Sequence, residues 1–187
     1  MALPAESDYR PDALDRRVAG LAAVAIAIHV LEAGFPSPVP GIKPGLANVV
    51  TLVALLRHGV ACAAWVAGLR VLVGSLLVGS FLTPTFWLSA TGAVSAFVVL
   101  AAAYAVGRAV PALRLSAVGL SVLAAMAHMT GQFMVAWTVF LPHAGLTVLL
   151  PVLLAAALVF GLASGLVALR VLDRMQRLER APEAGGY

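Results

Sequence analysis

The chain has 187 residues, of which 62% are hydrophobic and 11% charged, and its mean hydropathy is +1.02. So few charged side chains cannot cover a water-soluble globule of this length, and a lipid bilayer is therefore the expected solvent. The net charge of +4 does not indicate nucleic-acid binding, because the arginines lie at the ends of apolar runs and not in a basic stripe interleaved with aromatic residues.

Residues 1–17 mix acids with arginines and contain no apolar run, which is typical of a solvated tail and not of a signal peptide. From Val18 onward, clusters of Pro, Gly and Arg divide the chain into apolar segments close to the ~20 residues that a helix needs to cross ~30 Å of hydrocarbon. The sequence predicts an all-α integral membrane protein, a six-helix transmembrane bundle over residues 18–172 with a second polar tail over 173–187. The predicted spans are 18–35, 44–56, 59–81, 84–106, 115–140 and 146–172.

The distribution of cationic residues predicts the orientation of this bundle. Of 12 lysines and arginines, ten fall in the tails and connections that six spans place on one side, while Lys43 falls on the other and Arg70 within a span. Lysine and arginine in short loops favour the cytoplasmic side, so both termini are expected to be cytoplasmic. The ten are Arg10, Arg16, Arg17, Arg57, Arg108, Arg114, Arg170, Arg174, Arg177 and Arg180.

The loop between the first two predicted spans, residues 34–45, is rich in proline. Span two is also short, since 13 helical residues from Pro44 reach only ~20 Å. Alternating prolines prevent a helix over 36–41, and non-helical backbone at membrane depth is tolerated where protein buries it or where it lines a cavity. The loop is either a re-entrant lid over a pocket or an ordinary extracellular turn. Lys43, beside a helix start, is either part of an anion site or a solvated interfacial charge.

Polar residues inside the predicted spans are further candidates for a site. Arginine at the centre of a span costs ~2.5–3.5 kcal/mol on insertion scales, so Arg70 is expected to be paired or functional. Glu32 is its natural counter-charge, either as a structural clamp or beside a ligand. His128 and Gln132 are four residues apart and share a helix face, as a pocket pair or as interhelical hydrogen-bonding groups. Asn48 on short span two is expected to point inward with them.

Other classes of site are not indicated. No HxxxH, CxxC or carboxylate cluster accompanies His128, so no metal is expected. The nucleotide-binding pattern GxxxxGK[ST] is absent, so no cofactor is expected and any energy for transport would come from partners or gradients.

Several blocks of the chain resemble the Gx transporter family, whose bacterial members are labelled heptaprenyl diphosphate synthase component I. The resemblance extends from Val18 to about residue 169, with departures at Pro44, where a small aliphatic residue is usual, and at Met129, where an asparagine is usual. The matching blocks are Glu32 to Gly34, Pro36, Pro38, PGIKPGLANVVTL over 40–52, Arg70, FLTPTFWLSATGAV over 81–94 and SAVGLSVLAAMAHMTGQ over 116–132.

The resemblance implies a multi-pass protein of the bacterial inner membrane with a fold similar to the S components of energy-coupling-factor transporters. In those proteins the loop between the first two helices helps to close the substrate site. They also dock on a transmembrane partner through small residues at i, i+4 spacing on the first helix, which here are Ala19, Ala23 and Ala27.

Two functions of different classes follow. The first is a substrate-binding subunit of a transporter for a small, anionic or amphipathic solute. The second is a non-catalytic membrane subunit of polyprenyl diphosphate synthesis; no DDxxD motif is present to hold a magnesium diphosphate, so the chain is not expected to be an enzyme by itself. A purely structural subunit of a larger membrane complex is the third alternative. The predicted substrate-binding residues are Glu32, Lys43, Asn48, Arg70, His128 and Gln132.

Overall fold

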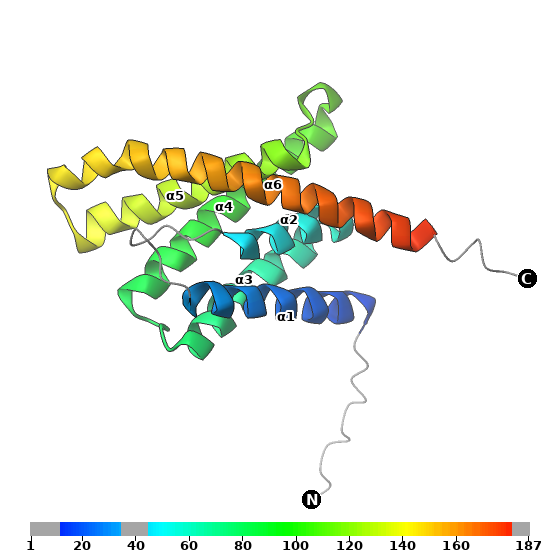
Figure 1. The fold of residues 1–187 in the computed structure, drawn as a ribbon, viewed down its shortest axis with the longest axis horizontal. Coiled ribbons are helices and arrows are strands. Elements are labelled where there is room, and N and C mark those ends of the chain that lie inside the picture. The colour runs from blue at the N-terminus through cyan, green and yellow to red at the C-terminus, as the bar shows by residue number, and fades with distance from the viewer. Residues whose placement is uncertain (1–11, 35–44, 181–187) are drawn as a thin grey trace, which may run out of the picture.

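A computed structural model describes residues 12–34 and 45–180 of the chain. All regular secondary structure in these two ranges is helical (Figure 1). The elements are α1 (Ala13–Gly34), α2 (Leu46–His58), α3 (Val60–Val78), α4 (Pro84–Ala109), the 3-10 turn η1 (Pro111–Leu113), α5 (Ala117–Val135), the π-helical turn η2 (Ala136–Phe140), the 3-10 segment η3 (Ala144–Leu149) and α6 (Leu150–Arg180).

Five of the helices are long and apolar enough to cross a membrane: α1, α3, α4, α5 continued by η2, and α6 preceded by η3. The prediction of an all-α membrane protein with several spans is therefore confirmed. Helix α2 has 13 residues and so reaches ~20 Å, less than the ~30 Å of hydrocarbon. The sequence likewise predicts a short second span, and with five candidate spans among the described residues the six-helix transmembrane bundle stays a prediction.

The helices form two groups of three that meet around α2. Helices α1, α2 and α3 contact one another, whereas α5 lies between α4 and α6 and contacts both. Helix α2 also contacts α5 and α6 and lies in the middle of the bundle (Figure 1). Its residues 47 and 49–55 are all buried. A helix that is buried on nearly every side can be short, because protein and not lipid surrounds its ends.

The turn between α2 and α3 consists of Gly59 alone, whose φ is +87°. Side chains strongly disfavour this backbone conformation, whereas glycine adopts it freely. Gly59 therefore lets the chain reverse after His58 without a longer loop and sets the position of α3 beside α2.

Helices α5 and α6 pack through glycines. A Cβ atom at Gly165 would lie 2.7 Å from the Cα of Val118, and one at Gly161 would lie 3.0 Å from the Cα of Val122. Glycine at these positions lets the two backbones approach closely, which is how helices commonly associate where lipid supplies no hydrophobic drive.

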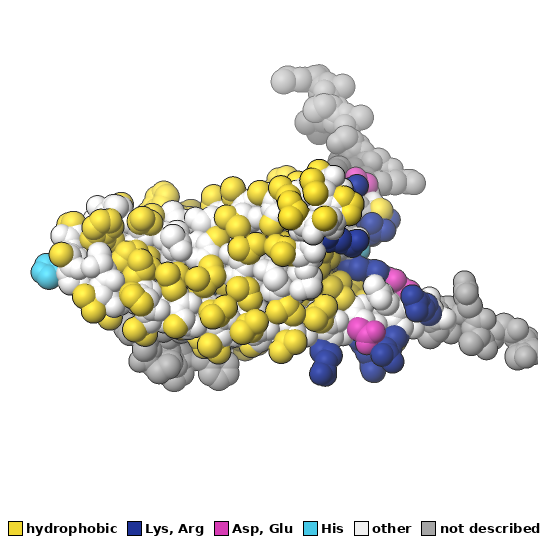
Figure 2. Space-filling view, turned by 90° about the horizontal axis from the view of Figure 1, so that it is seen from above, with side chains coloured by type: hydrophobic (Ala, Val, Ile, Leu, Met, Phe, Trp, Pro, Cys, Tyr) yellow, Lys and Arg dark blue, Asp and Glu magenta, His cyan; other side chains and the backbone are white. Residues whose placement is uncertain are grey.

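Basic residues gather at one end of the molecule, formed by the start of α1 and the end of α6 (Figure 2). Helix α6 has 31 residues, or ~46 Å, so it is longer than the hydrocarbon layer and its residues 173–180 carry the charged end. Arg57 at the end of α2 donates a hydrogen bond to Glu179 there. This contact ties α2 to the far end of α6.

Candidate functional site

Arg70 is the charged residue at the centre of the candidate site. It lies on α3 with 6% of its surface exposed, and its Nη1 donates a hydrogen bond to Oδ1 of Asn48 on α2 at 2.8 Å. Its Nε is buried and has no hydrogen-bond partner among the described residues. An arginine in an apolar interior is costly unless its donors are satisfied, so the unused Nε marks a position for a further acceptor.

Two other buried polar atoms also lack partners within the described ranges. One is Oγ1 of Thr51, which follows Asn48 by one turn of α2, and the other is Nδ1 of His128 on α5. His128 lies close enough to Arg70 for their charges to interact. The Arg70 Nε, Thr51 Oγ1 and His128 Nδ1 atoms, together with Asn48, are called the polar cluster below.

Gly92 on α4 is what allows His128 and Gln132 to lie against that helix. A Cβ atom there would be 2.7 Å from both Nε2 of His128 and Cγ of Gln132. The two side chains therefore share one face of α5, as their spacing predicts, and that face packs on α4. Helix α5 begins at a side-chain cap, since Oγ of Ser116 accepts a hydrogen bond from the Gly119 amide at 3.2 Å.

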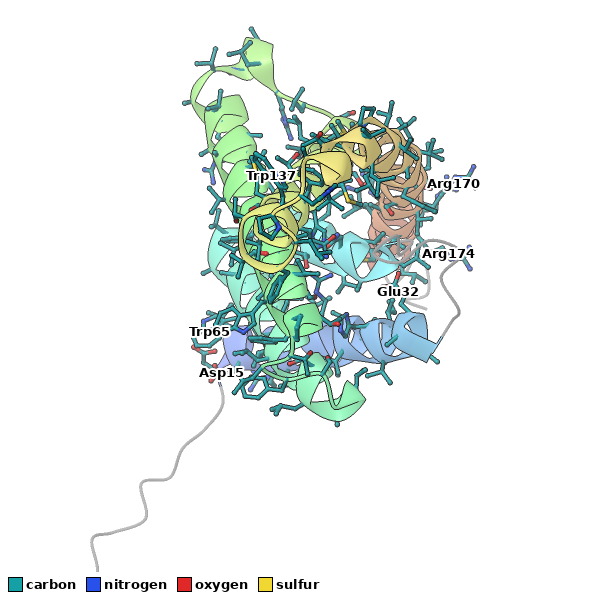
Figure 3. All side chains as sticks on the ribbon, turned by 90° about the vertical axis from the view of Figure 1, so that its left-hand side faces the viewer. Asp15, Glu32, Trp65, Trp137, Arg170 and Arg174 are labelled. Carbon is teal, nitrogen blue, oxygen red and sulfur yellow. The ribbon has the colours of Figure 1, made fainter. Side chains whose placement is uncertain are left out.

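Glu32 lies in the last turn of α1, and its side chain reaches the start of α2 (Figure 3). Its Oε1 accepts a hydrogen bond of 2.7 Å from the amide of Leu46, the first residue of α2. A carboxylate at a helix N-terminus satisfies a free amide and interacts favourably with the helix dipole. Glu32 is near Arg70, but the contacts of the described residues include no direct ion pair between them, because each side chain bonds to α2 instead.

The other predicted residues belong to the loop before α2 and to α1. Lys43 and the proline-rich part of the loop, residues 35–44, lie outside the described residues, so the lid and the anion site stay predictions. Ala19, Ala23 and Ala27 lie on α1 and are exposed, opposite the buried Ala22 and Ala25. Among the described residues no group of three or more His, Cys, Asp or Glu side chains could hold a metal ion.

Two surface hollows are lined by described residues, and neither includes a predicted substrate-binding residue. One, of about 720 Å³, lies on α4 and α5 and includes Trp87 and Gly131. The other, of about 510 Å³, follows the charged end of α6 from Arg170 to Arg177.

Gly92 was not predicted from the sequence as part of the site. The signal available was a glycine within an apolar span, but the chain holds 17 glycines and the sequence does not show which of them faces a histidine. The position of α5 against α4, set by tertiary packing, supplies that information.

Comparison with protein-family models gives one match, to heptaprenyl diphosphate synthase component I, over residues 21–171. The matched range includes all of the polar cluster and ends near the charged extension of α6. Searches of curated proteins and of solved structures gave no match. Because the family model covers most of the chain, the protein, a multi-helix membrane protein, belongs to the heptaprenyl diphosphate synthase component I family.

Proposed function

We propose that the protein is a membrane subunit that binds a small anionic or amphipathic solute at the polar cluster. The observation that carries this proposal is that three buried polar atoms, on Arg70, Thr51 and His128, have no hydrogen-bond partner among the described residues. Each such atom costs free energy in an apolar interior, and the three lie on α3, α2 and α5, of which α2 contacts both others, which supports a site that an additional polar group completes.

The chemistry of the cluster favours an anion. The guanidinium Nε of Arg70 is buried without a partner among the described residues, whereas Nη1 of the same group already donates to Asn48. A carboxylate or phosphate oxygen would accept from Nε, and the Thr51 hydroxyl would donate a second hydrogen bond. The apolar walls of α2 and α3 would suit a hydrocarbon portion of the same solute.

We propose an orientation with both termini in the cytoplasm and the site in the outer half of the bundle. The start of α1 and the ends of α2 and α6, where Arg57 bonds to Glu179, lie toward the basic end, whereas the end of α1, which holds Glu32, and the start of α2 lie toward the other. The loop over 34–45 would then face outward, where it can act as the lid.

Thiol labelling tests this orientation. A membrane-impermeant reagent added to intact cells should label Pro38→Cys and leave Ala109→Cys unlabelled; Cys62 is buried and gives little background. Labelling at 109 but not at 38 would reverse the topology and move the proposed site to the inner leaflet.

Two roles are compatible with such a site. In an S-component-like transporter subunit, the solute would be cargo, and the exposed Ala19, Ala23 and Ala27 would contact a transmembrane coupling subunit in the bacterial inner membrane. In the role that the family description names, the solute would be a prenyl diphosphate, and the same surface would contact a synthase subunit. The second role is favoured by the family match, and the first by the resemblance of the loop and the polar residues to S components.

Native mass spectrometry of the purified protein tests both roles. The wild type should carry one small molecule, which Arg70→Gln loses and which the exposed-residue control Arg108→Gln retains. A vitamin-like solute would support transport, and a prenyl diphosphate would support the biosynthetic role. A wild type that carries nothing from its native membrane would overturn the proposal, and the structural-subunit alternative would then lead.

A further inference from the structure

One face of α6 remains exposed along the whole helix and changes character near its end. Val152, Val159 and Leu166 are exposed by 61%, 62% and 58% and recur every seven residues, which places them on one face. Arg170 and Arg174 continue this face at the next turns. An aliphatic stripe that ends in two arginines has the pattern of hydrocarbon followed by a charged membrane surface.

The two arginines are free to bind an external group. Both are exposed and point away from α6 (Figure 3), and neither has a hydrogen bond or ion pair with the rest of the described chain. Arg177, three residues further, differs because its Nε donates to Oδ2 of Asp173 at 3.0 Å. The neighbouring acid Asp173 is engaged by Arg177, so Arg170 and Arg174 have no ion pair of their own among the described residues.

A hollow of about 510 Å³ lies beside these guanidinium groups. Its lining combines Val171 and Met175 with Arg170, Arg174 and the Asp173–Arg177 ion pair. Apolar and cationic groups together match a ligand that has both a hydrocarbon chain and a phosphate.

We propose that this face of α6 binds an anionic phospholipid of the cytoplasmic leaflet. The phosphate would be held by Arg170 and Arg174, which are one turn apart, and an acyl chain would follow the stripe through Leu166 and Val159. Guanidinium groups bind phosphate oxygens in a bidentate geometry, and basic residues next to a span attract anionic lipids.

The continuity of the face favours a lipid over an acidic protein. A soluble partner would reach only the arginines, whereas a lipid also covers the stripe from Val152 to Leu166. This proposal is independent of the polar cluster, which lies on other helices and faces the interior.

Native mass spectrometry with added lipid tests the proposal. The detergent-solubilised full chain is titrated with phosphatidylglycerol and, separately, with phosphatidylcholine. The wild type should prefer phosphatidylglycerol, and Arg170→Gln with Arg174→Gln should weaken its binding about 30-fold, or about fivefold for each arginine. Asp173→Asn, which releases Arg177, should strengthen it.

A matched control removes two exposed arginines at the end of α4 and in the connection to α5, Arg108→Gln with Arg114→Gln. It should keep the wild-type preference, because the proposed contact belongs to α6. Equal losses in the control and in the α6 variant would overturn the proposal in favour of a general charge effect. Wild-type binding in the α6 variant would also overturn it and would leave an acidic protein partner as the explanation for the two arginines.

Discussion

Threonine hydroxyls behave differently in the two halves of the bundle. On α4 and α5, Thr91 and Thr130 donate to the carbonyls of Trp87 and Met126, four residues earlier in their own helices, each at 2.8 Å. On α2, the buried Thr51 hydroxyl has no such partner among the described residues. A hydroxyl in a membrane helix is usually satisfied by its own backbone, so Thr51 is a departure that is consistent with the proposed binding site.

The two halves are also held together differently. Helices α4, α5 and α6 rely on glycines that let the backbones approach, whereas α2 is linked to α1 and α3 by side-chain hydrogen bonds from Glu32 and Arg70. Larger side chains at these glycines should therefore disrupt the group α4, α5 and α6. Removal of polar side chains should disrupt the group α1, α2 and α3.

The largest effect is expected from Gly165→Leu. Its Cβ would lie 2.7 Å from the Cα of Val118, a backbone atom that cannot rotate away, so α5 and α6 must separate. We expect a loss of about 3 kcal/mol in the free energy of unfolding, measured by thermal or denaturant unfolding in detergent. Gly68→Leu is the control, because a Cβ at Gly68 meets nothing within 4 Å. A similar loss in both variants would show that close packing is not what makes Gly165 necessary.

The next effect concerns the hydrogen bond between Arg70 and Asn48. Arg70→Leu should cost about 2 kcal/mol, because it leaves the half-buried Asn48 side chain without its donor. Asn48→Leu added to it should restore about half of that stability, since both polar partners are then gone. Ligand retention should stay lost in the double variant. Recovery of the ligand along with stability would make Arg70 a structural residue only.

Glu32→Ala should have a smaller effect of about 1 kcal/mol, because it removes the acceptor for the Leu46 amide at the start of α2. Glu32→Gln keeps an oxygen in place and should lose only a few tenths of a kcal/mol through the lost charge at the helix N-terminus. The free energies of unfolding of the two variants show whether α2 requires the hydrogen bond or the charge of Glu32. Equal losses would mean that charge and not hydrogen bonding is what α2 requires.

The smallest effect is expected at the contact between Arg57 and Glu179. The Glu179 side chain is 60% exposed, so Glu179→Gln should lower the free energy of unfolding less than any of the preceding variants. The loss should shrink further in 1 M salt, where exposed charges are screened. A larger loss that salt does not change would indicate that α6 positions α2 by packing at this point.

The helices could be predicted because long apolar runs bounded by Pro, Gly and Arg permit few alternatives in a membrane. The partner of Arg70 could not be predicted in the same way. Charge alone favours Glu32, but the backbone amide of Leu46 engages Glu32, and Asn48 in the same first turn of α2 reaches Arg70. That choice depends on how far α2 is displaced along α1 and α3, which a sequence pattern does not specify. The convergence of His128 with Lys43 stays a prediction, since Lys43 lies outside the described residues.

An experimental density map of the protein purified from its native membrane tests the central claim most directly. We predict non-protein density within hydrogen-bonding distance of Arg70 Nε and His128 Nδ1, and its absence in Arg70→Leu with Asn48→Leu. Ordered water alone at these atoms, or side chains from residues 35–44 that satisfy them, would contradict the account, because the cluster would then need no solute.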